Sequence, residues 1–382
     1  MSKIFVDGSV LEKEFQGTYT YVKELYTAYK KKFPEDEITF GVNDAKKVKR
    51  IFDKNLDFKF IEYKYKNKLI QLLFEIPLLL RKSKFDVIHF QYTIPFFLFL
   101  AGKTKSVVTI HDLIFNDIPE SVPVSYRLSR NVMFRLSAIF SSSISTVSEY
   151  SKERISAIYK IKPEKITVIA NGVAAKFYKD YNSVEVKAKV AAKFNIQNYL
   201  LYVSRIEPRK NHDILVQAFE EMELYKKGYQ LVLVGKCTIP IKNLFEKIEE
   251  INSIKSNSIV WIDQLEEDDL LDVYRAAEVF IYPSKAEGFG IPPIEAAALG
   301  IKTICSNTTA MHDFDFIDQK FNPHDKEDLK SKINEILKEE WDAAKKKYIL
   351  DAIKANFNWE SGAIKLKALF NQITNENSNN RY

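Results

Sequence analysis

The sequence predicts an α/β fold made of two doubly wound parallel sheets, one in each half of the chain. With 382 residues, the chain is longer than one ordinary domain. Short β-rich runs alternate with helical stretches throughout, which is typical of parallel sheets covered by helices. A polar stretch over residues 176–189 interrupts the alternation, and we interpret it as the junction between two domains.

The expected strands of the first half are short and apolar, and helical stretches separate most of them. They are "KIFVDG", "EITFGV", "VIHFQY", "SVVTIHD", "SISTVS" and "KITVIANG", with helices at "TYTYVKELYTAYKKKF" and "SYRLSRNVMFRLSAIF". Strands in the second half are expected at "YLLYVSRI", "YQLVLVG", "SIVWID", "VFIYPS" and "IKTICSN". The predicted domains are residues 1–177 and 178–359, and a helix over 360–382 completes the first. Ligands of such sheets bind at the carboxyl ends of the strands, so we expect a cleft there between the two domains.

Composition narrows the classes of partner and the compartment. The net charge of +6, from 57 basic and 51 acidic residues, is too small to indicate nucleic-acid binding. Cys237 and Cys305 form no CxxC pair, and the first residues contain no signal peptide, so we expect reduced thiols and a cytoplasmic protein. The five histidines are scattered, and no metal site is predicted.

The most apolar stretch, "LIQLLFEIPLLL" at residues 69–80, is shorter than the ~20 residues of a membrane span. Basic residues flank it on both sides. Such a helix suits either a protein core or the surface of an anionic membrane, where it would give the protein a peripheral contact with the inner face.

The segment "AEGFGIPPIEAAALG" places two acids around a glycine-containing turn. The strand "VFIYPS" precedes it, and the helix "IPPIEAAALG" follows with proline in its first turn. Gly288 and Gly290 let the backbone approach a ligand, and the unpaired amides at the helix start favour a phosphate. Glu287 and Glu295 suit sugar hydroxyls as bidentate acceptors, although solvent-facing glutamates are an equal alternative.

A second charged segment, "YVSRIEPRKN", follows the first strand of the second half. Arg205 and Lys210 therefore lie at or just beyond a strand end, on the same edge of the sheet as "EGFG". Two cations there suit a diphosphate leaving group, whose charge grows as its bond to the sugar breaks. The alternative is surface charge.

Together these segments resemble the retaining GT-B glycosyltransferases of family 4, also called group 1. The matching residues are "YVSRIEPRKNHDILVQAF", "LVLVG", "LLDVYRAAEVFIYPSKAEGFGIPPIEAAALG" and "NFNWE", which cover most of residues 198–360. The first half matches more loosely, through "TIHDLIF", "TVSEYSKERI" and "VIANGV". The resemblance implies two Rossmann-like domains facing across a cleft.

The resemblance also implies residue roles. Arg205 and Lys210 would hold the donor diphosphate, Glu295 the ribose hydroxyls and Glu287 the hydroxyls of the donor sugar. The backbone of Gly288, Phe289 and Gly290 would lie along sugar and phosphate, His111 near the reaction centre, and Gly17 near the phosphate. The sequence departs from the family pattern twice, with a single glycine in "QGTY" and no acid in "CSNTTAMHDF".

The implied reaction moves a sugar from a UDP- or GDP-sugar, such as GDP-mannose, to an acceptor hydroxyl with retention and without a metal. The acceptor would be a carbohydrate or a lipid-linked sugar in polysaccharide or glycolipid assembly. A sugar-nucleotide epimerase of similar build and a non-catalytic membrane-surface protein are the alternatives. An NAD-dependent oxidoreductase is not favoured, because no GxGxxG follows the first strand.

Overall fold

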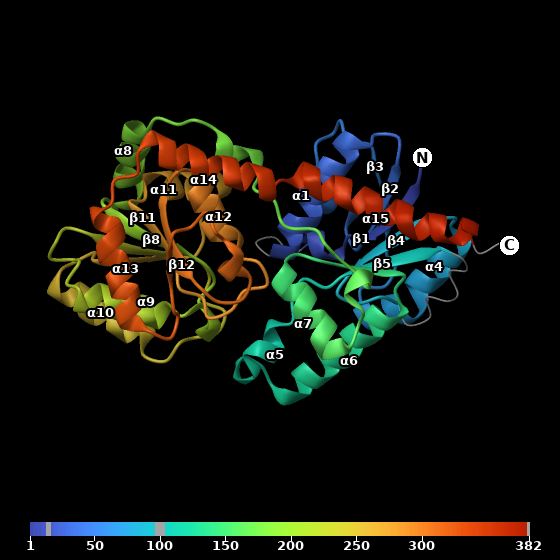
Figure 1. Cartoon of the computed structure of the whole chain (residues 1–382), viewed down its shortest axis with the longest axis horizontal. Helices are drawn as coiled ribbons and strands as arrows, with labels where there is room; N and C mark the ends of the chain where they lie inside the picture. Colours follow the sequence, from blue (N-terminus) through green and yellow to red (C-terminus); the bar gives the residue numbers. More distant parts are fainter. Residues whose placement is uncertain (13–16, 96–103, 380–382) are drawn as a thin grey trace. The chain divides into compact units, whose positions relative to one another are not determined.

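The computed structural model describes residues 1–12, 17–95 and 104–379, and the chain divides into two compact units (Figure 1). The first unit contains Met1–Gly172 and the C-terminal residues from Phe357, and the second contains Val173–Asn356. The boundaries expected from the sequence, 177/178 and 359/360, lie a few residues farther along the chain. In the described ranges, no helix combines the length and the apolar character needed to cross a membrane.

The first unit is built on a seven-stranded parallel sheet with the order β3-β2-β1-β4-β5-β6-β7. Its strands are β1 (Lys3–Asp7), β2 (Glu37–Val42), β3 (Phe58–Glu62), β4 (Val87–Gln91), β5 (Lys105–Thr109), β6 (Ser143–Thr146) and β7 (Ile166–Val168). Side chains alternate between the two faces of each strand. Along β4, for example, Ile88 and Phe90 join one hydrophobic cluster, whereas His89 lies on the other face, beside Tyr26.

The helices of the first unit cover both faces of this sheet. The α-helices are α1 (Gly17–Lys32), α2 (Ala45–Lys49), α3 (Lys68–Ile70), α4 (Ile76–Lys82), α5 (Ile114–Asp117), α6 (Val124–Phe140), α7 (Glu149–Tyr159) and α15 (Trp359–Asn379). A π-helical turn, η2 (Gln71–Glu75), joins α3 to α4, and the short 3-10 turns are η1 (Ser9–Glu12), η4 (Pro119–Ser121) and η5 (Pro163–Lys165). Figure 1 shows α15 running beside α1, on which it packs. On the opposite face, α4, α6 and α7 pack on the cluster that contains Ile88 and Phe90.

The second unit repeats the architecture with six parallel strands in the order β10-β9-β8-β11-β12-β13. They are β8 (Tyr199–Val203), β9 (Gln230–Val234), β10 (Ile259–Ile262), β11 (Val279–Tyr282), β12 (Lys302–Ser306) and β13 (Gln319–Phe321). Its α-helices are α8 (Ser183–Phe194), α9 (His212–Glu221), α10 (Leu244–Ile254), α11 (Glu267–Ala276), α12 (Ile291–Ala298), α13 (Lys326–Lys338) and α14 (Ala343–Asn356), and its 3-10 turns are η6 (Ala175–Tyr178), η7 (Pro208–Lys210) and η8 (Thr309–Asp313). The predicted α/β class with two parallel, doubly wound sheets is confirmed.

Strand order brings the charged segments of the second unit together. β8 and β11 are neighbours in the sheet, although residues 204–278 separate them in the sequence. Their carboxyl ends meet at one edge, so η7, which follows β8, lies against the loop that follows β11. The backbone N–H of Lys285 donates to Arg209 O at 2.9 Å across this junction.

Candidate active site

Glu287 is the centre of a buried charge cluster at the carboxyl ends of β8 and β11. Its Oε1 accepts from Lys210 Nζ at 2.6 Å and Ser284 Oγ at 2.5 Å. Tyr282 Oη donates to the same oxygen at 3.1 Å and accepts from Lys210 Nζ at 2.9 Å. The Oε2 atom of Glu287 lies 3.1 Å from Arg209 Nη1. Glu287 and Lys210 are 8% and 7% exposed, so the structure brings these two predicted residues together as a buried ion pair.

Burial and charge act in opposite directions on Glu287. Burial favours the neutral acid, but Arg209 and Lys210 outweigh it and lower the pKa of Glu287 from 4.5 to about 2. Burial lowers the pKa of Lys210, and the nearby positive charge of Arg209 lowers it further, although the negative charge of Glu287 acts in the opposite direction. We regard the group as charged at neutral pH, since each ion has hydrogen-bonding partners of opposite charge.

Two arginines flank the cluster and differ in exposure. Arg209 is largely buried and donates to Ala286 O and Glu207 Oε1, both at 2.6 Å. The side chain of Arg205 is half exposed, with Nη2 3.8 Å from Glu207 Oε2. The sequence reasoning missed Arg209, which η7 turns towards the loop after β11.

The loop between Glu287 and α12 is buried along with the glutamate. Gly290 precedes the helix with φ +96°, a conformation that favours glycine, and a Cβ there would lie 3.1 Å from Met311 Cγ. Phe289 is 8% exposed and packs edge-on against Phe314. The Glu287 N–H donates to Thr309 Oγ1 at 2.9 Å, so the loop after β12 holds this backbone in place.

Glu295 differs from Glu287 in having no strong partner. It is partly buried on α12, and its carboxylate has no hydrogen bond or ion pair within the described ranges. Burial raises the pKa of Glu295 to about 7, an effect opposed by Lys176 and reinforced by Glu267. Burial also raises the pKa of Tyr274, and the negative charge of Glu295 raises it further. The Tyr274 hydroxyl has no hydrogen-bonding partner among the described residues.

In the first unit, His111 lies just beyond the carboxyl end of β5. It is 6% exposed and sits against Tyr21 and Tyr92, at ring separations of 4.8 and 5.1 Å. Its Nε2 donates to Gln91 Oε1 at 2.9 Å, because that oxygen can only accept. Burial, with a smaller effect from His89, lowers the pKa of His111 to about 3, so the ring is neutral at physiological pH.

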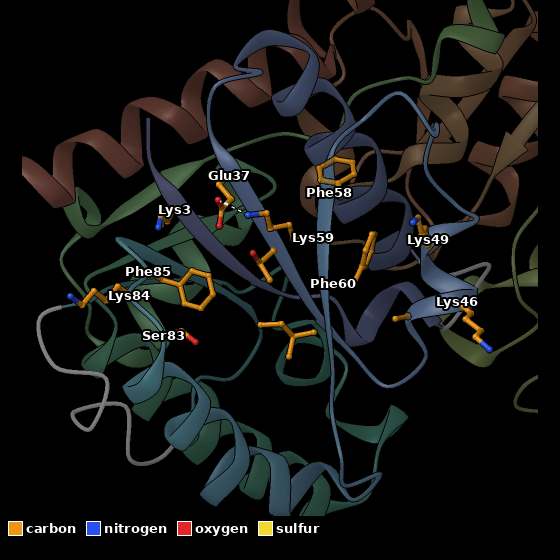
Figure 2. Close-up of a pocket in the computed structure, with 13 residues that line it drawn as sticks. Lys3, Glu37, Lys46, Lys49, Phe58, Lys59, Phe60, Ser83, Lys84 and Phe85 are labelled. Atoms are coloured by element: carbon orange, nitrogen blue, oxygen red, sulfur yellow. Dashed lines mark ion pairs between the residues drawn. The ribbon is translucent and has the colours of Figure 1, made fainter.

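Gly17 begins α1 and is exposed, and a Cβ there would meet no atom within 4 Å. Residues 13–16 of the predicted phosphate loop lie outside the described residues. A cavity of about 720 Å³ in the first unit opens elsewhere, along the edge strand β3 (Figure 2). Lys3, Glu37 and Phe58, the first residues of β1, β2 and β3, line it, so it is distinct from the edge that carries His111.

Solved structures with the same fold include glycosyltransferases. Anabaena Alr3699/HepE in complex with UDP-glucose superposes with a TM-score of 0.74 at 16% identity, covering 97% of this chain and 100% of that chain. A glycosyltransferase from Rickettsia africae gives a TM-score of 0.72 at 19% identity, with coverage of 97% and 98%. These similarities establish the fold.

Family models cover both units. "Glycosyltransferase Family 4" matches residues 17–177, and "Glycosyl transferases group 1" matches residues 184–354. The chain belongs to this glycosyltransferase family, and the resemblance inferred from the motifs is confirmed.

Several curated relatives are mannosyltransferases by name. The Escherichia coli O-antigen chain mannosyltransferase B is 28% identical over 210 residues, 54% of either chain. The E. coli serotype-specific mannosyltransferase WbdA is 27% identical over 234 residues, which are 60% of this chain and 28% of WbdA. The matches thus span less than two thirds of these relatives.

Proposed function

We propose that the protein transfers a hexosyl group, with retention, from a nucleotide-diphosphate sugar to a hydroxyl of a carbohydrate or lipid-linked acceptor. The observation that carries this proposal is the charge cluster beside the start of α12, followed one turn later by the unpartnered carboxylate of Glu295. The names of the mannosyltransferase relatives favour a GDP-mannose donor, and the UDP-glucose complex of Alr3699/HepE keeps UDP-sugars as the alternative.

Each part of the donor has a matching group in the second unit. Arg205 is exposed enough to contact the diphosphate, and Lys210 and the N–H groups of Ile291 and Ile294 at the start of α12 add positive potential. Pro292 and Pro293 have no N–H to offer. Glu295 accepts from the ribose hydroxyls, which supply the partners that its carboxylate lacks. Glu287 is assigned to the donor sugar and also holds Lys210 and Arg209 in position.

The reaction breaks the bond between the anomeric carbon and the leaving phosphate oxygen, and the diphosphate keeps the electron pair. The acceptor oxygen bonds to the anomeric carbon on the face that the diphosphate leaves, and its proton passes to a leaving phosphate oxygen. The cations and the helix start stabilise the growing negative charge, so we propose that no metal is required. Neutral His111 lies near the donor sugar in this proposal and serves as a hydrogen-bonding group. The proposed place of activity is the cytoplasm, at the inner face of the membrane.

Nucleotide binding is the first test. Thermal unfolding is followed with UDP, GDP, ADP and dTDP, first with a divalent metal ion and then with EDTA in its place. One of the nucleotides is expected to raise the melting temperature, and no stabilisation by any of them would refute the transferase proposal. Loss of stabilisation on adding EDTA would refute metal independence alone.

The ribose assignment has a matched pair of variants. Glu295→Ala is expected to weaken binding of the stabilising nucleotide by about tenfold or more, as for a lost charged hydrogen bond. Glu249→Ala, an exposed acid on α10, serves as the control and should bind as the wild type does. Equal affinity in Glu295→Ala and wild type would show that the assignment is wrong. Stereochemistry is read from the anomeric proton coupling of the product by NMR, and an inverted product would refute retention.

A further inference from the structure

The helical segment of residues 68–82 in the first unit is apolar on two faces. Leu72, Ile76 and Leu80, spaced four residues apart, are buried in the hydrophobic cluster beneath it. A second stripe with the same spacing points to solvent. It consists of Ile70, Phe74 and Leu78, which are 37%, 57% and 50% exposed. A helix at the surface of a soluble protein normally carries polar residues on its outer face.

α6 repeats this pattern over a longer stripe. Phe134 and Ala138 join the same buried cluster as α4. Apolar residues occupy every fourth position on the outer side of the helix, and their exposed fractions lie between 37% and 70%. They are Val124, Leu128, Val132, Leu136 and Phe140. Regular exposure of large apolar side chains indicates a surface that is covered when the protein works.

The two stripes lie on the outside of one helical layer. Both helices contribute to the cluster that contains Phe5 of β1, so both cover the same face of the sheet. Parallel pairing puts Phe5, Thr39 and Lys59 in register, and Lys3 is two residues before Phe5. Lys3 and Lys59 therefore project from the face that α4 and α6 cover. We call this side of the first unit the α4–α6 face.

Basic residues outnumber acidic ones along both stripes. α6 contains Arg127, Arg130 and Arg135 and no acid. The only acid in residues 68–82 is Glu75, and its carboxylate accepts from the backbone N–H groups of Lys64 at 2.5 Å and Tyr65 at 3.2 Å. Exposed cations flank this segment on both sides. They are Lys64, Lys66, Arg81, Lys82 and Lys84.

The cavity in the first unit extends this basic surface. Ser83, Lys84 and Phe85, which continue the chain from α4, form one of its walls (Figure 2). Its volume is about 720 Å³, and the only acid in its lining, Glu37, pairs with Lys59 at 2.7 Å. The lysines of the lining are Lys3, Lys46, Lys49, Lys59 and Lys84. A cavity of this charge suits the phosphates of anionic headgroups.

We propose that the α4–α6 face docks on the surface of an anionic lipid bilayer. The stripes of α3–α4 and α6 enter the boundary between headgroups and acyl chains, and the flanking cations and the lysine-lined cavity contact lipid phosphates. A second copy of the chain is a poor occupant, because it would bring the arginines of α6 against an equally basic surface.

Vesicle flotation of the purified chain, without nucleotide or acceptor, tests the proposal independently of transferase activity. Vesicles of phosphatidylcholine alone are compared with vesicles containing 30% phosphatidylglycerol, at about 0.1 M salt. The chain is expected to float at least ~tenfold more with the anionic vesicles. Equal recovery with both compositions, or none with either, would overturn the proposal.

Variants in each stripe locate the surface. Leu128→Ser with Val132→Ser, and separately Phe74→Ser with Leu78→Ser, should each reduce the partition coefficient by about tenfold or more. The matched control is Val184→Ser on α8, where the valine is 76% exposed in the second unit, and it should float as the wild type does. All these positions are exposed, so melting temperatures should stay close to the wild-type value.

The remaining outcomes also decide the matter. Arg127→Glu with Arg135→Glu should remove the preference for anionic vesicles, since both charges change sign. Unchanged flotation of the stripe variants would overturn the proposed surface. A stripe variant that turns an oligomer into a monomer, with no vesicle binding by the wild type, would assign the face to a protein partner instead.

Discussion

Replacing Glu287 by Gln tests how much the buried charge cluster stabilises the second unit. The substitution keeps the size of the side chain and removes the negative charge that faces Lys210 and Arg209. A pKa lowered from 4.5 to about 2 corresponds to a stabilisation of about 3 kcal/mol at neutral pH, at ~1.4 kcal/mol per unit. Loss of one partner of a buried ion pair typically costs ~3–5 kcal/mol, so the two routes agree.

The measurement is the melting temperature of the second unit by scanning calorimetry. For a unit of this size, a loss of about 3 kcal/mol lowers the melting temperature by about 6–12 °C. The matched control is Glu250→Gln on α10, which breaks an exposed pair with Lys247 at 3.0 Å. An exposed pair of that kind contributes at most ~1 kcal/mol, so the control should change little.

The dependence on pH has a definite sign. Because the folded pKa of Glu287 is depressed, its contribution is complete above pH 4.5 and is lost as pH falls through about 2. The difference between wild type and Glu287→Gln should therefore shrink on acidification across that range. If Glu287→Gln melts within about 1 °C of the wild type at pH 7, the reasoning from buried charges is refuted.

Three further outcomes are expected. The pKa of Glu295 is raised to about 7, so its contribution to stability is complete below pH 4.5 and lost as pH rises through 7. The melting temperature of the second unit should therefore fall between these pH values in the wild type and fall less in Glu295→Gln. An equal fall in both proteins would contradict this prediction. Gly172→Ala should lower the free energy of unfolding of the first unit by about 1–3 kcal/mol, because the added Cβ would lie 2.5 Å from Trp359 N. Denaturant titration measures this loss. Gly17→Ala is the control, since a Cβ at Gly17 meets no atom within 4 Å, whereas Gly228 is unsuitable because its φ is positive. Burial lowers the pKa of His111 to about 3, so NMR spectra at pH 5 should show a neutral imidazole. Any stability that the neutral ring contributes is present above pH 6.5 and is lost as pH falls towards 3. Titration of the ring near pH 6.5 would contradict its burial.

The sequence was sufficient for the architecture because parallel sheets leave a clear pattern. Runs such as "VIHFQY" and "VFIYPS" are short and rich in β-forming residues, and the structure has β4 and β11 at these positions. Strand order, however, depends on contacts between segments far apart in the sequence. The contact of η7 with the loop after β11 follows from that order and from no local signal.

The candidate site shows the same division. Arg205, Lys210 and Glu287 could be selected because they follow strand ends. Arg209 was not selected, because only the 3-10 turn shows that Arg209 faces Glu287 together with Lys210. From the sequence alone, Arg209 between Glu207 and Lys210 cannot be distinguished from a solvent-exposed arginine.

The partners of the two glutamates were also beyond the sequence. Both were expected to accept sugar hydroxyls. Three protein side chains donate to Glu287, whereas no described residue donates to the carboxylate of Glu295. The spacing of eight residues fixes where the acids lie along the chain. It does not fix how many donors surround each one.

The first unit is assembled from both ends of the described chain, since α15 packs on α1 after the whole second unit has intervened. During synthesis the second unit is contiguous and complete before α15 exists, whereas the first unit lacks the helix that covers α1. Tyr21, Leu25 and Tyr29 on α1 are fully buried in the finished protein and wait for that covering. The unit that is translated first is therefore the last to complete its fold. A chain that ends near residue 356 would contain the whole second unit, but the apolar side of α1 in its first unit would not be covered by α15.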